Sequence, residues 1–552
     1  MPSQIKSLSI KNFKGFSDEV RIELRPITLL FGANSAGKSS ILHALQYARE
    51  ILERNNTNAG HTLQGGDAVD LGGFLNLVHG RDQERRIEIE IGMVLDDVSI
   101  PEIVQDAFED WQTTDSEVWS LYETLQTIRQ KVSNISVRLI IGWNTFRAEP
   151  VVVGYEIATN GVWCVKLEAS GDGRDTSMRL NRENPIFMVD VSDGERLLAE
   201  LGDWINPEDL CEDRSEPAIK NSDALLNHAP LKQQVSVLNE VFYAVQEAGM
   251  ERPGDGLRSW LNGFNGALPR LDQILFIPAP GAKGAANVYV VREFTAFLSW
   301  LTIGPAVLLR EQLRALRYIG PLRRIPPRGF QTSLTKSEAA WSDGMAAWAT
   351  LLNGPQSMVD DCSASMSDPD KLATGYSIVR KQIQEFDLSG SQPTPIGRAR
   401  SRIEFIDTSG VSHQPQDVGV GISQVLPVVV ASHDGSASVV CIEQPELHIH
   451  PAVQVALGDL FIHGVLNHEL SFLIETHSEH LILRLLRRIR EAAEEMNIAK
   501  EASVNLKKLV GVYCLAREDS RVTVIEVPVN DEGDFDKPWP NGFFDERGTE
   551  LF

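Results

Sequence analysis

Residues 32–39 read Gly32-Ala33-Asn34-Ser35-Ala36-Gly37-Lys38-Ser39, which satisfies the pattern G-x-x-x-x-G-K-S/T. A buried apolar strand, Ile27 to Phe31, precedes this stretch, and helical spacing follows it from Ser39 to Glu50. That context separates a phosphate-binding loop from a chance glycine turn. The glycines let backbone N–H groups turn toward phosphates, and the helix N-terminus adds its positive dipole end. The stretch therefore predicts a nucleotide-binding α/β fold.

Two side chains of this loop have separate roles in phosphate chemistry. Lys38 is expected to bridge the β- and γ-phosphates, and the Ser39 hydroxyl is expected to ligate magnesium. The expected cofactors are therefore ATP and Mg²⁺. The nucleotide-binding residues predicted here are Asn34, Ser35, Ala36, Gly37, Lys38, Ser39 and Ser40.

A hydrophobic strand that ends in acid occurs in the second half of the chain, at Val439-Val440-Cys441-Ile442-Glu443-Gln444-Pro445-Glu446. Glu443 stands where a carboxylate that orients magnesium is expected. A nucleotide site built from both ends of a long chain implies that the middle is inserted into an ATPase head. This arrangement points to an ATP-driven machine rather than a metabolic enzyme.

Two shorter elements add to the predicted site. Asp417 to Gln424 places two glycines before a helix expected to start near Ser423, and such a start exposes N–H groups to an anion, here the γ-phosphate on a second subunit. An ordinary glycine-rich helix entry is the alternative. His477 follows the strand Ser471 to Ile474, where it can reach a γ-phosphate or the attacking water. The residues predicted to face the nucleotide from the glycine element are Gly419, Gly421, Ser423 and Gln424.

Half of the twelve histidines lie between His448 and His480. Their spacings match no standard zinc set and no cysteine pair accompanies them, so the sequence does not predict a structural metal.

Composition restricts the class of protein. A chain of 552 residues favours two to four lobes, and 42% hydrophobic with 23% charged residues is ordinary for a soluble protein. The net charge of −24 argues against a surface covered in basic residues, although a local basic patch would suffice to contact DNA. There is no apolar run long enough for a membrane and no signal-peptide core. Five scattered cysteines without a C-x-x-C pair favour a reducing cytoplasm.

Five motifs occur in one order: Asn12-Phe13-Lys14-Gly15-Phe16, the loop with Asn34, D-V-G-x-G-x-S-Q, E-Q-P-E-L-H-x-H-P and T-H-S. With them the chain resembles the ABC-type ATPases of the overcoming-lysogenization-defect and RecF-like group, relatives of the chromosome-maintenance and double-strand-break-repair ATPases. The resemblance covers residues 1–95 and 316–552. Within this group, the chain looks closest to a prokaryotic subgroup with a short C-terminal domain of unknown function.

The resemblance implies an α/β fold with an ABC-type P-loop head, made of a mixed sheet and an antiparallel lobe. It implies that two heads dimerise around two ATP molecules, with higher oligomers left open. His477 would act as the switch histidine. Gln64 is a candidate for the glutamine that senses magnesium, with an ordinary loop residue as the alternative. The predicted metal-binding residues are Ser39, Gln64 and Glu443.

The chain departs from the family at its catalytic base. Related ATPases usually carry Asp-Glu where this chain has Glu443-Gln444, and the second residue orients the attacking water. A glutamine amide is a poor proton acceptor, so Gln444 predicts slow hydrolysis in which Glu446 or His477 assists. The predicted catalytic residues are Glu443, Gln444, Glu446 and His477.

Four parts are predicted along the chain: an N-terminal ATPase lobe (1–190), a mainly helical insertion (191–315), a C-terminal ATPase lobe (316–490) and a small α+β module (491–552). The Ser-, Asp- and Pro-rich stretch 354–370 is predicted to be an exposed loop. Asp534-Phe535-Asp536 mimics the D-x-D of the related nucleases, but too few residues follow the long helix for that domain.

Two functions remain open at this point. One is an ATP-gated homodimer that regulates a separately encoded effector, such as a nuclease, in anti-phage defence. The other is a DNA-binding repair or chromosome-maintenance ATPase without such a partner. Arginines cluster along one predicted helix, and they indicate either a solvated surface paired with nearby acids or a phosphate-binding track on DNA. Their positions are Arg484, Arg487, Arg488 and Arg490.

Overall fold

The computed structural model describes residues 5–55, 57, 70–96, 98–102, 119–171, 176–190, 234–236, 264–275, 295–330, 338–387, 389, 392–499, 505–518 and 521–539. The chain divides into two compact units, one made of residues 1–91 and 310–552 and the other of residues 92–309. The predicted boundaries at 190, 315 and 490 do not coincide with this division, and the four-part organisation remains a prediction.

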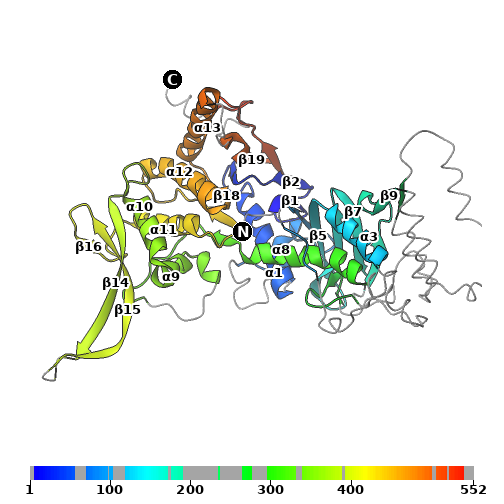
Figure 1. Ribbon diagram of the computed structural model, residues 1–552, viewed down its shortest axis with the longest axis horizontal. Helices are drawn as coiled ribbons and strands as arrows, with labels where there is room; N and C mark the ends of the chain where they lie inside the picture. Colours follow the sequence, from blue (N-terminus) through cyan, green and yellow to red (C-terminus); the bar gives the residue numbers. More distant parts are fainter. Residues whose placement is uncertain are drawn as a thin grey trace, which may run out of the picture. The chain divides into compact units, whose positions relative to one another are not determined.

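A six-stranded sheet forms the centre of the first unit (Figure 1). Its strand order is β13 (Arg317–Ile319), β17 (Val439–Glu443), β18 (Ser471–Glu475), β3 (Ile27–Gly32), β19 (Val510–Glu518) and β20 (Arg521–Glu526). The first five strands run parallel, and β20 pairs with β19 antiparallel. Every residue of β3 and β17 is buried, as expected for parallel strands covered on both faces.

The two ends of the chain meet in this sheet. The N-terminal strand β3 lies between β18 and β19, both from the C-terminal part of the chain. The predicted α/β P-loop class is therefore confirmed, with both ends of the chain in one sheet as expected. The strands β19 and β20 of the predicted C-terminal module extend the same sheet.

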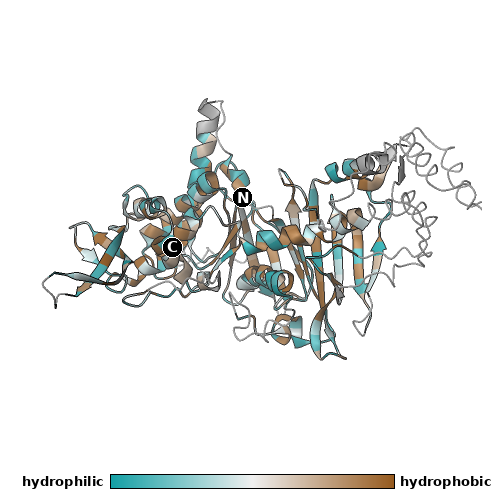
Figure 2. Ribbon diagram, turned by 60° about the horizontal axis from the view of Figure 1, so that its bottom comes forward, coloured by the Kyte–Doolittle hydropathy of each residue, from teal (hydrophilic) through white to brown (hydrophobic). Residues whose placement is uncertain are grey.

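Long helices connect the parallel strands of the first unit: α1 (Lys38–Arg54), α11 (Val420–His433), α12 (Pro451–His468) and α13 (Glu479–Ala499). α12 begins with His450 as N-cap, whose side chain accepts from Ala452 N–H, and with Pro451 in the first turn. α13 is amphipathic, because Leu481, Leu485 and Ile489 are buried while charged residues occupy its other face (Figure 2).

One predicted loop is a helix. Residues 354–370 were expected to be an exposed loop, but α10 (Gln356–Ser367) occupies most of them, directly after α9 (Met345–Asn353). The buried residues Val359, Cys362 and Met366 recur at helical spacing and form an apolar stripe. Packing of this stripe outweighs the low helix propensity of the Ser and Asp residues around it.

Several strands of the first unit lie outside the six-stranded sheet. β14 (Tyr376–Asp387) and β15 (Thr394–Asp407) form a long hairpin, extended by β16 (Ser412–His413) (Figure 1). Near the N-terminus the order is β2 (Val20–Glu23), β1 (Ile5–Lys11) and β4 (Ile87–Val94). Two single-turn helices accompany them, α2 (Phe74–Leu77) and α14 (Leu506–Leu509).

The second unit is built on an antiparallel meander of β5 (Asn134–Asn144), β6 (Glu149–Thr159), β7 (Val162–Ala169) and β8 (Thr176–Leu180). Short pairs form between β9 (Met188–Asp190) and β10 (Gln234–Ser236), and between β11 (Phe264–Asn265) and β12 (Leu268–Pro269). Its helices include α3 (Trp119–Gln130) and the first residues of α8 (Gly304–Arg314). Most of the predicted helical insertion lies outside the described residues.

No helix within the described ranges combines the length and the apolar character needed to cross a membrane.

Candidate nucleotide and magnesium site

The loop after β3 has the backbone that the sequence predicts for a phosphate cradle. Gly32 has φ 140°, and a Cβ there would lie 2.3 Å from the carbonyl oxygen of Leu515 on β19. Ser35 and Gly37 also have positive φ values, and Gly37 is the N-cap of α1. Only glycine fits at position 32, because both the torsion and the approach of β19 exclude a side chain. The loop therefore leaves its own N–H groups and the start of α1 available to an anion.

Lys38 is folded back onto this loop. Its side chain is only 3% exposed, and Nζ donates to the carbonyl oxygens of Gly32 and Ala33, each at 2.9 Å. Burial lowers the pKa of Lys38, and the charges of Glu475, Glu446 and Glu443 oppose that shift. An ammonium has three N–H donors, so one remains for a phosphate.

Two carboxylates stand beside Lys38 and Ser39. Glu443 and Glu475 are the last residues of β17 and β18 and are register partners on these neighbouring strands. The Ser39 hydroxyl donates to Oε2 of Glu475 at 2.6 Å, and Oε1 of Glu475 lies 3.9 Å from Lys38 Nζ. Hard oxygen ligands of this kind suit Mg²⁺. Ser39 and Glu443 belong to the predicted metal set, whereas Glu475 was not predicted.

Glu443 is held by residues that the sequence did not single out. Tyr318 on β13 donates its hydroxyl to Oε1 of Glu443 at 2.6 Å, and His43 Nε2 lies 3.4 Å from the same oxygen. Lys14 Nζ lies 2.5 Å from His43 Nδ1. An ammonium can only donate, so Nδ1 accepts and the proton of the neutral ring is on Nε2, toward Glu443. In the described part of the chain these contacts occupy Oε1, which leaves Oε2 for a metal ion.

These contacts set the ionisation of the cluster. Burial acts to raise the pKa of Glu443, but the hydrogen bonds from His43 and Tyr318 and the charge of Lys14 outweigh it, and the pKa is lowered. Burial and the neighbouring Glu443 raise the pKa of Glu475, although its bond to Ser39 opposes the shift. Burial lowers the pKa of Lys14 to about 8. Glu443 is thus the carboxylate kept ionised, which fits a metal ligand.

The predicted catalytic residues Gln444, Glu446 and His477 lie next to this cluster. Gln444 has φ 44° and its N–H donates to the carbonyl oxygen of Glu475 at 2.8 Å. Glu446 accepts from the Thr476 hydroxyl at 2.9 Å and from His477 N–H at 2.6 Å. Burial raises the pKa of Glu446, and burial with the charge of Lys38 lowers that of His477. Neighbouring elements thus gather the three predicted residues, but their catalytic roles remain predictions.

The glycine element begins α11. Gly419 is the exposed N-cap, and a Cβ on Gly421 would lie 2.5 Å from the carbonyl oxygen of His448. The helix starts at Val420, three residues before the expected Ser423. Ser423 is fully buried and donates its hydroxyl to the carbonyl oxygen of Pro415 at 3.0 Å. In this chain the helix start, and not the Ser423 hydroxyl, is therefore what faces outward.

Arg323 joins this element to the acidic strand. It is 3% exposed, and its guanidinium donates to main-chain oxygens of Gly320, Gln424, Glu443 and Gln444 at 2.8 to 3.3 Å. The Gln424 side chain in turn accepts from Arg323 N–H at 3.1 Å and donates to its carbonyl oxygen. Gln424, predicted to face the nucleotide, is thus engaged with Arg323. Sequence reasoning missed this link, because no motif contains Arg323.

The remaining predicted residues are placed as follows. In the loop, Asn34 and Ser35 are exposed, whereas Ala36 and Ser40 are buried. Gln64, the candidate magnesium sensor, lies outside the described residues.

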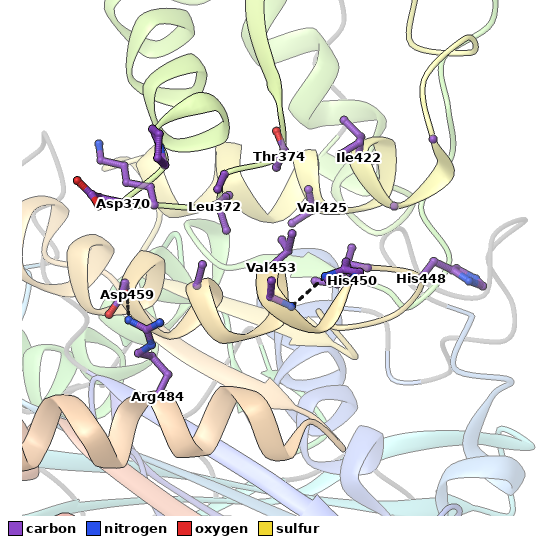
Figure 3. Close-up of a pocket in the computed structure, with 18 of the residues that line it drawn as sticks. Asp370, Leu372, Thr374, Ile422, Val425, His448, His450, Val453, Asp459 and Arg484 are labelled. Carbon is purple, nitrogen blue, oxygen red and sulfur yellow. Dashed lines mark hydrogen bonds and ion pairs between the residues drawn. The ribbon is translucent and has the colours of Figure 1, made fainter. Parts of the chain in front are cut away.

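A cavity of about 920 Å³ borders the glycine element but not the phosphate loop. Ile422 and Val425 of α11 lie opposite Val453 of α12 across it (Figure 3). An ion pair of 2.9 Å between Asp459 on α12 and Arg484 on α13 also borders it. The size of this cavity does not identify it as the nucleotide site, because Lys38, Ser39 and Glu443 do not line it.

Family models match both halves of the head. A model described as "AAA ATPase domain" matches residues 4–146, and one described as "AAA domain, putative AbiEii toxin, Type IV TA system" matches residues 318–484. These matches contain the phosphate loop and the acidic strand, respectively. Together with the geometry above, they show that this chain carries AAA-type ATPase domains. No curated protein matches the chain.

Solved structures of SMC heads are similar at a low level. The Smc head bound to the C-winged helix domain of ScpA is 10% identical with a TM-score of 0.36, over 96% of this chain and 98% of that chain. The Smc head with an extended coiled coil from Pyrococcus furiosus, bound to the C-terminal domain of ScpA, is 11% identical with a TM-score of 0.36, over 96% and 97%. The SMC head domain from Thermotoga maritima is 7% identical with a TM-score of 0.33, over 95% and 100%.

Proposed function

We propose that this ATPase binds Mg²⁺-ATP between two copies of the chain, hydrolyses it slowly and regulates a separately encoded effector, a nuclease being the first candidate. The observation that carries the nucleotide part is the meeting of Lys38, Ser39, Glu443 and Glu475 at one edge of the central sheet. Ser39 and Glu443 would hold the Mg²⁺, which when bound neutralises phosphate charge.

Hydrolysis needs a group that orients water, and Glu446 is the proposed base. Its pKa is raised by burial, which brings it closer to neutral pH than an ordinary carboxyl group. Its carboxylate is also held by Thr476 and His477 N–H, so its position is fixed. These two bonds stabilise the carboxylate and weaken it as a base. Slow turnover follows, since Gln444 supplies no carboxylate at the neighbouring position.

Dimerisation is supported by what the start of α11 exposes. Gly419 is exposed, and the neighbouring Val420 leaves 51% of its surface exposed although it is a large aliphatic residue. A helix N-terminus beside an exposed apolar residue suits contact with a second copy that carries a bound polyphosphate. An ATP-bound partner would satisfy the first N–H groups of α11.

The effector part rests on one family match and on the contacts of the arginines of α13. The family matched at residues 318–484 is described as a putative toxin of a type IV toxin–antitoxin system, and this favours a role in defence. The arginines of α13 argue against DNA as the direct partner, because they are bonded to groups of the chain itself. This favours the effector. Arg484 and Arg488 pair with Asp459, Arg487 and Arg488 pair with Glu491, and Arg490 donates to the carbonyl oxygen of Glu532.

The test measures ATP hydrolysis by the chain and the mass of its assembly in solution. Phosphate release by the purified chain should be slow, should require Mg²⁺ and should be lost in Lys38→Ala. Light scattering of Glu446→Gln with Mg²⁺-ATP should show twice the mass seen without nucleotide. A mass that stays monomeric while ATP is bound contradicts the dimer. DNA binding that tightens with ATP, or DNA cleavage by this chain without another protein, contradicts the proposed effector and favours the DNA-binding alternative.

A further inference from the structure

Three histidines meet at the far end of α11, away from the glycine element. His433 is the last residue of α11, and His463 and His468 lie in the last two turns of α12. One ring nitrogen of each lies within 4.8 Å of those of the other two. The ring centroids form a nearly equilateral triangle with sides of 5.4, 5.3 and 5.5 Å. His433 is buried, and the other two are partly buried.

The nitrogen positions suit a metal ion better than a set of hydrogen bonds. His433 Nδ1 lies 3.3 Å from His468 Nε2. That is long for an N–H···N bond, but two nitrogens at about 2.05 Å from a tetrahedral zinc ion lie about 3.3 Å apart. His463 Nδ1 is buried and has no hydrogen-bond partner in the described part of the chain. An unsatisfied buried nitrogen beside two others requires an explanation, and a shared ion provides one.

The outer contact of His433 has the form expected around a metal. Its Nε2 lies 2.8 Å from the hydroxyl of Ser365 on α10. If Nδ1 binds a metal, the proton is on Nε2 and donates to this hydroxyl, which fixes the tautomer and orients the ring.

Two helix ends contribute favourably to binding a cation at this cluster. His433 and His468 are the last residues of their helices, so the negative ends of two helix dipoles point toward the cluster. The charge of Asp361 on α10 also favours a cation at His463, whereas the ammonium of Lys371 opposes it. His463 and His468 are only partly buried, so water can complete a fourth position.

We propose that His433, His463 and His468 form a binding site for one divalent transition-metal ion of the zinc class, which ties the C-terminal ends of α11 and α12 together. α11 has 14 residues, so the site lies about 20 Å from the glycines at its start. Its three ligands are different residues from Ser39 and Glu443, which are predicted to hold magnesium, so the two ions would occupy separate sites. It fixes the far end of the helix whose start faces the second nucleotide.

Sequence spacing did not indicate this site. His463 and His468 have the spacing H-x4-H of half a zinc-finger site but lack the cysteine pair that completes it, and His433 lies on another helix, 35 positions before His468. Only the packing of α11 against α12 brings the third ligand to the other two.

Metal binding by the purified full-length chain tests the proposal. After removal of metal by a chelator and without nucleotide, Zn²⁺ titration should show one tight site per chain. Co²⁺ at the same site should give the visible absorption bands of a four-coordinate ion. His463→Gln keeps a polar side chain of similar length and should weaken binding by about 100-fold or more. Zn²⁺ should raise the Tm of the wild type but not that of His463→Gln.

Two control variants separate this site from others. His480→Ala removes an exposed histidine of α13 and should bind Zn²⁺ like the wild type. Ser39→Ala alters the predicted magnesium site and should also retain the tight zinc site. The proposal is overturned if no saturable Zn²⁺ binding occurs, or if folded His463→Gln binds as tightly as the wild type. Binding that is lost in Ser39→Ala would instead assign the ion to the nucleotide site.

Discussion

The hydroxyl of Ser39 donates to Oε2 of Glu475 at 2.6 Å, across 436 positions of the sequence. This bond joins the phosphate loop to the end of β18, and Lys38 Nζ lies 3.9 Å from the other oxygen of the same carboxylate. A magnesium ion at Ser39 has to replace the Glu475 carboxylate as partner of this hydroxyl or share its oxygens. We therefore expect Glu475 to affect how the loop accepts Mg²⁺-ATP.

Glu475→Gln tests this relationship. The amide keeps the shape of the side chain but removes the charge that lies beside Lys38 and Ser39. We expect hydrolysis to fall by about tenfold or more, because the charges around the metal are no longer balanced. Phosphate release at saturating Mg²⁺-ATP measures the effect. Glu494→Gln, an exposed position on α13, is the matched control. An unchanged rate in Glu475→Gln would show that this carboxylate has no part in the site.

Tyr318→Phe should change the pH dependence of hydrolysis. Its hydroxyl is one of the groups that lower the pKa of Glu443 against the effect of burial. Without that bond the pKa of Glu443 rises, so the carboxylate becomes protonated at a higher pH and loses Mg²⁺ there. The acidic limb of kcat/KM should therefore move to higher pH. The binding of Mg²⁺ at neutral pH should be weaker by about 1 kcal/mol. A profile that superimposes on the wild type contradicts this assignment.

The parts of the site that the sequence predicts are those carried by continuous stretches. The phosphate loop needs a strand, glycines and a helix in succession, and residues 27–50 contain all three. Glu443 could be found because it ends an apolar strand. Tyr318 and Glu475 could not be assigned, because their roles come from the strand order that places β13 and β18 beside β17. The helix α10 was missed because three buried apolar residues outweigh a composition typical of a loop.

Arg323 is expected to stabilise the head more than any nearby surface arginine. Arg323→Ala removes the donor to four main-chain carbonyl groups and leaves several of them buried without a partner. We expect a loss of about 2 to 4 kcal/mol in the free energy of unfolding. Denaturant unfolding measures it.

The adjacent Arg324 is the control for this experiment. Its side chain is 68% exposed and pairs with Asp343 at 3.2 Å. Exposed ion pairs contribute little, so Arg324→Ala should cost about 1 kcal/mol at most. Equal losses at the two positions would mean that the buried contacts of Arg323 do not stabilise the head.

Gln444→Glu should accelerate hydrolysis. The substitution restores a carboxylate at the position where related ATPases carry their base, and its backbone already has a fixed conformation, because its N–H is bonded to Glu475. A positioned general base contributes about 10²-fold or more, so a tenfold gain is a conservative expectation.

In the wild type, by contrast, Glu446→Gln should remove most activity. That variant should also move the acidic limb to lower pH, because Glu446, whose pKa is raised from 4.5, no longer titrates and Glu443, whose pKa is lowered, remains. The decisive comparison is the double variant. If Gln444→Glu takes over as base, adding Glu446→Gln to it should cost little, whereas a full loss in the double variant would show that Glu446 does work that a carboxylate at position 444 cannot replace.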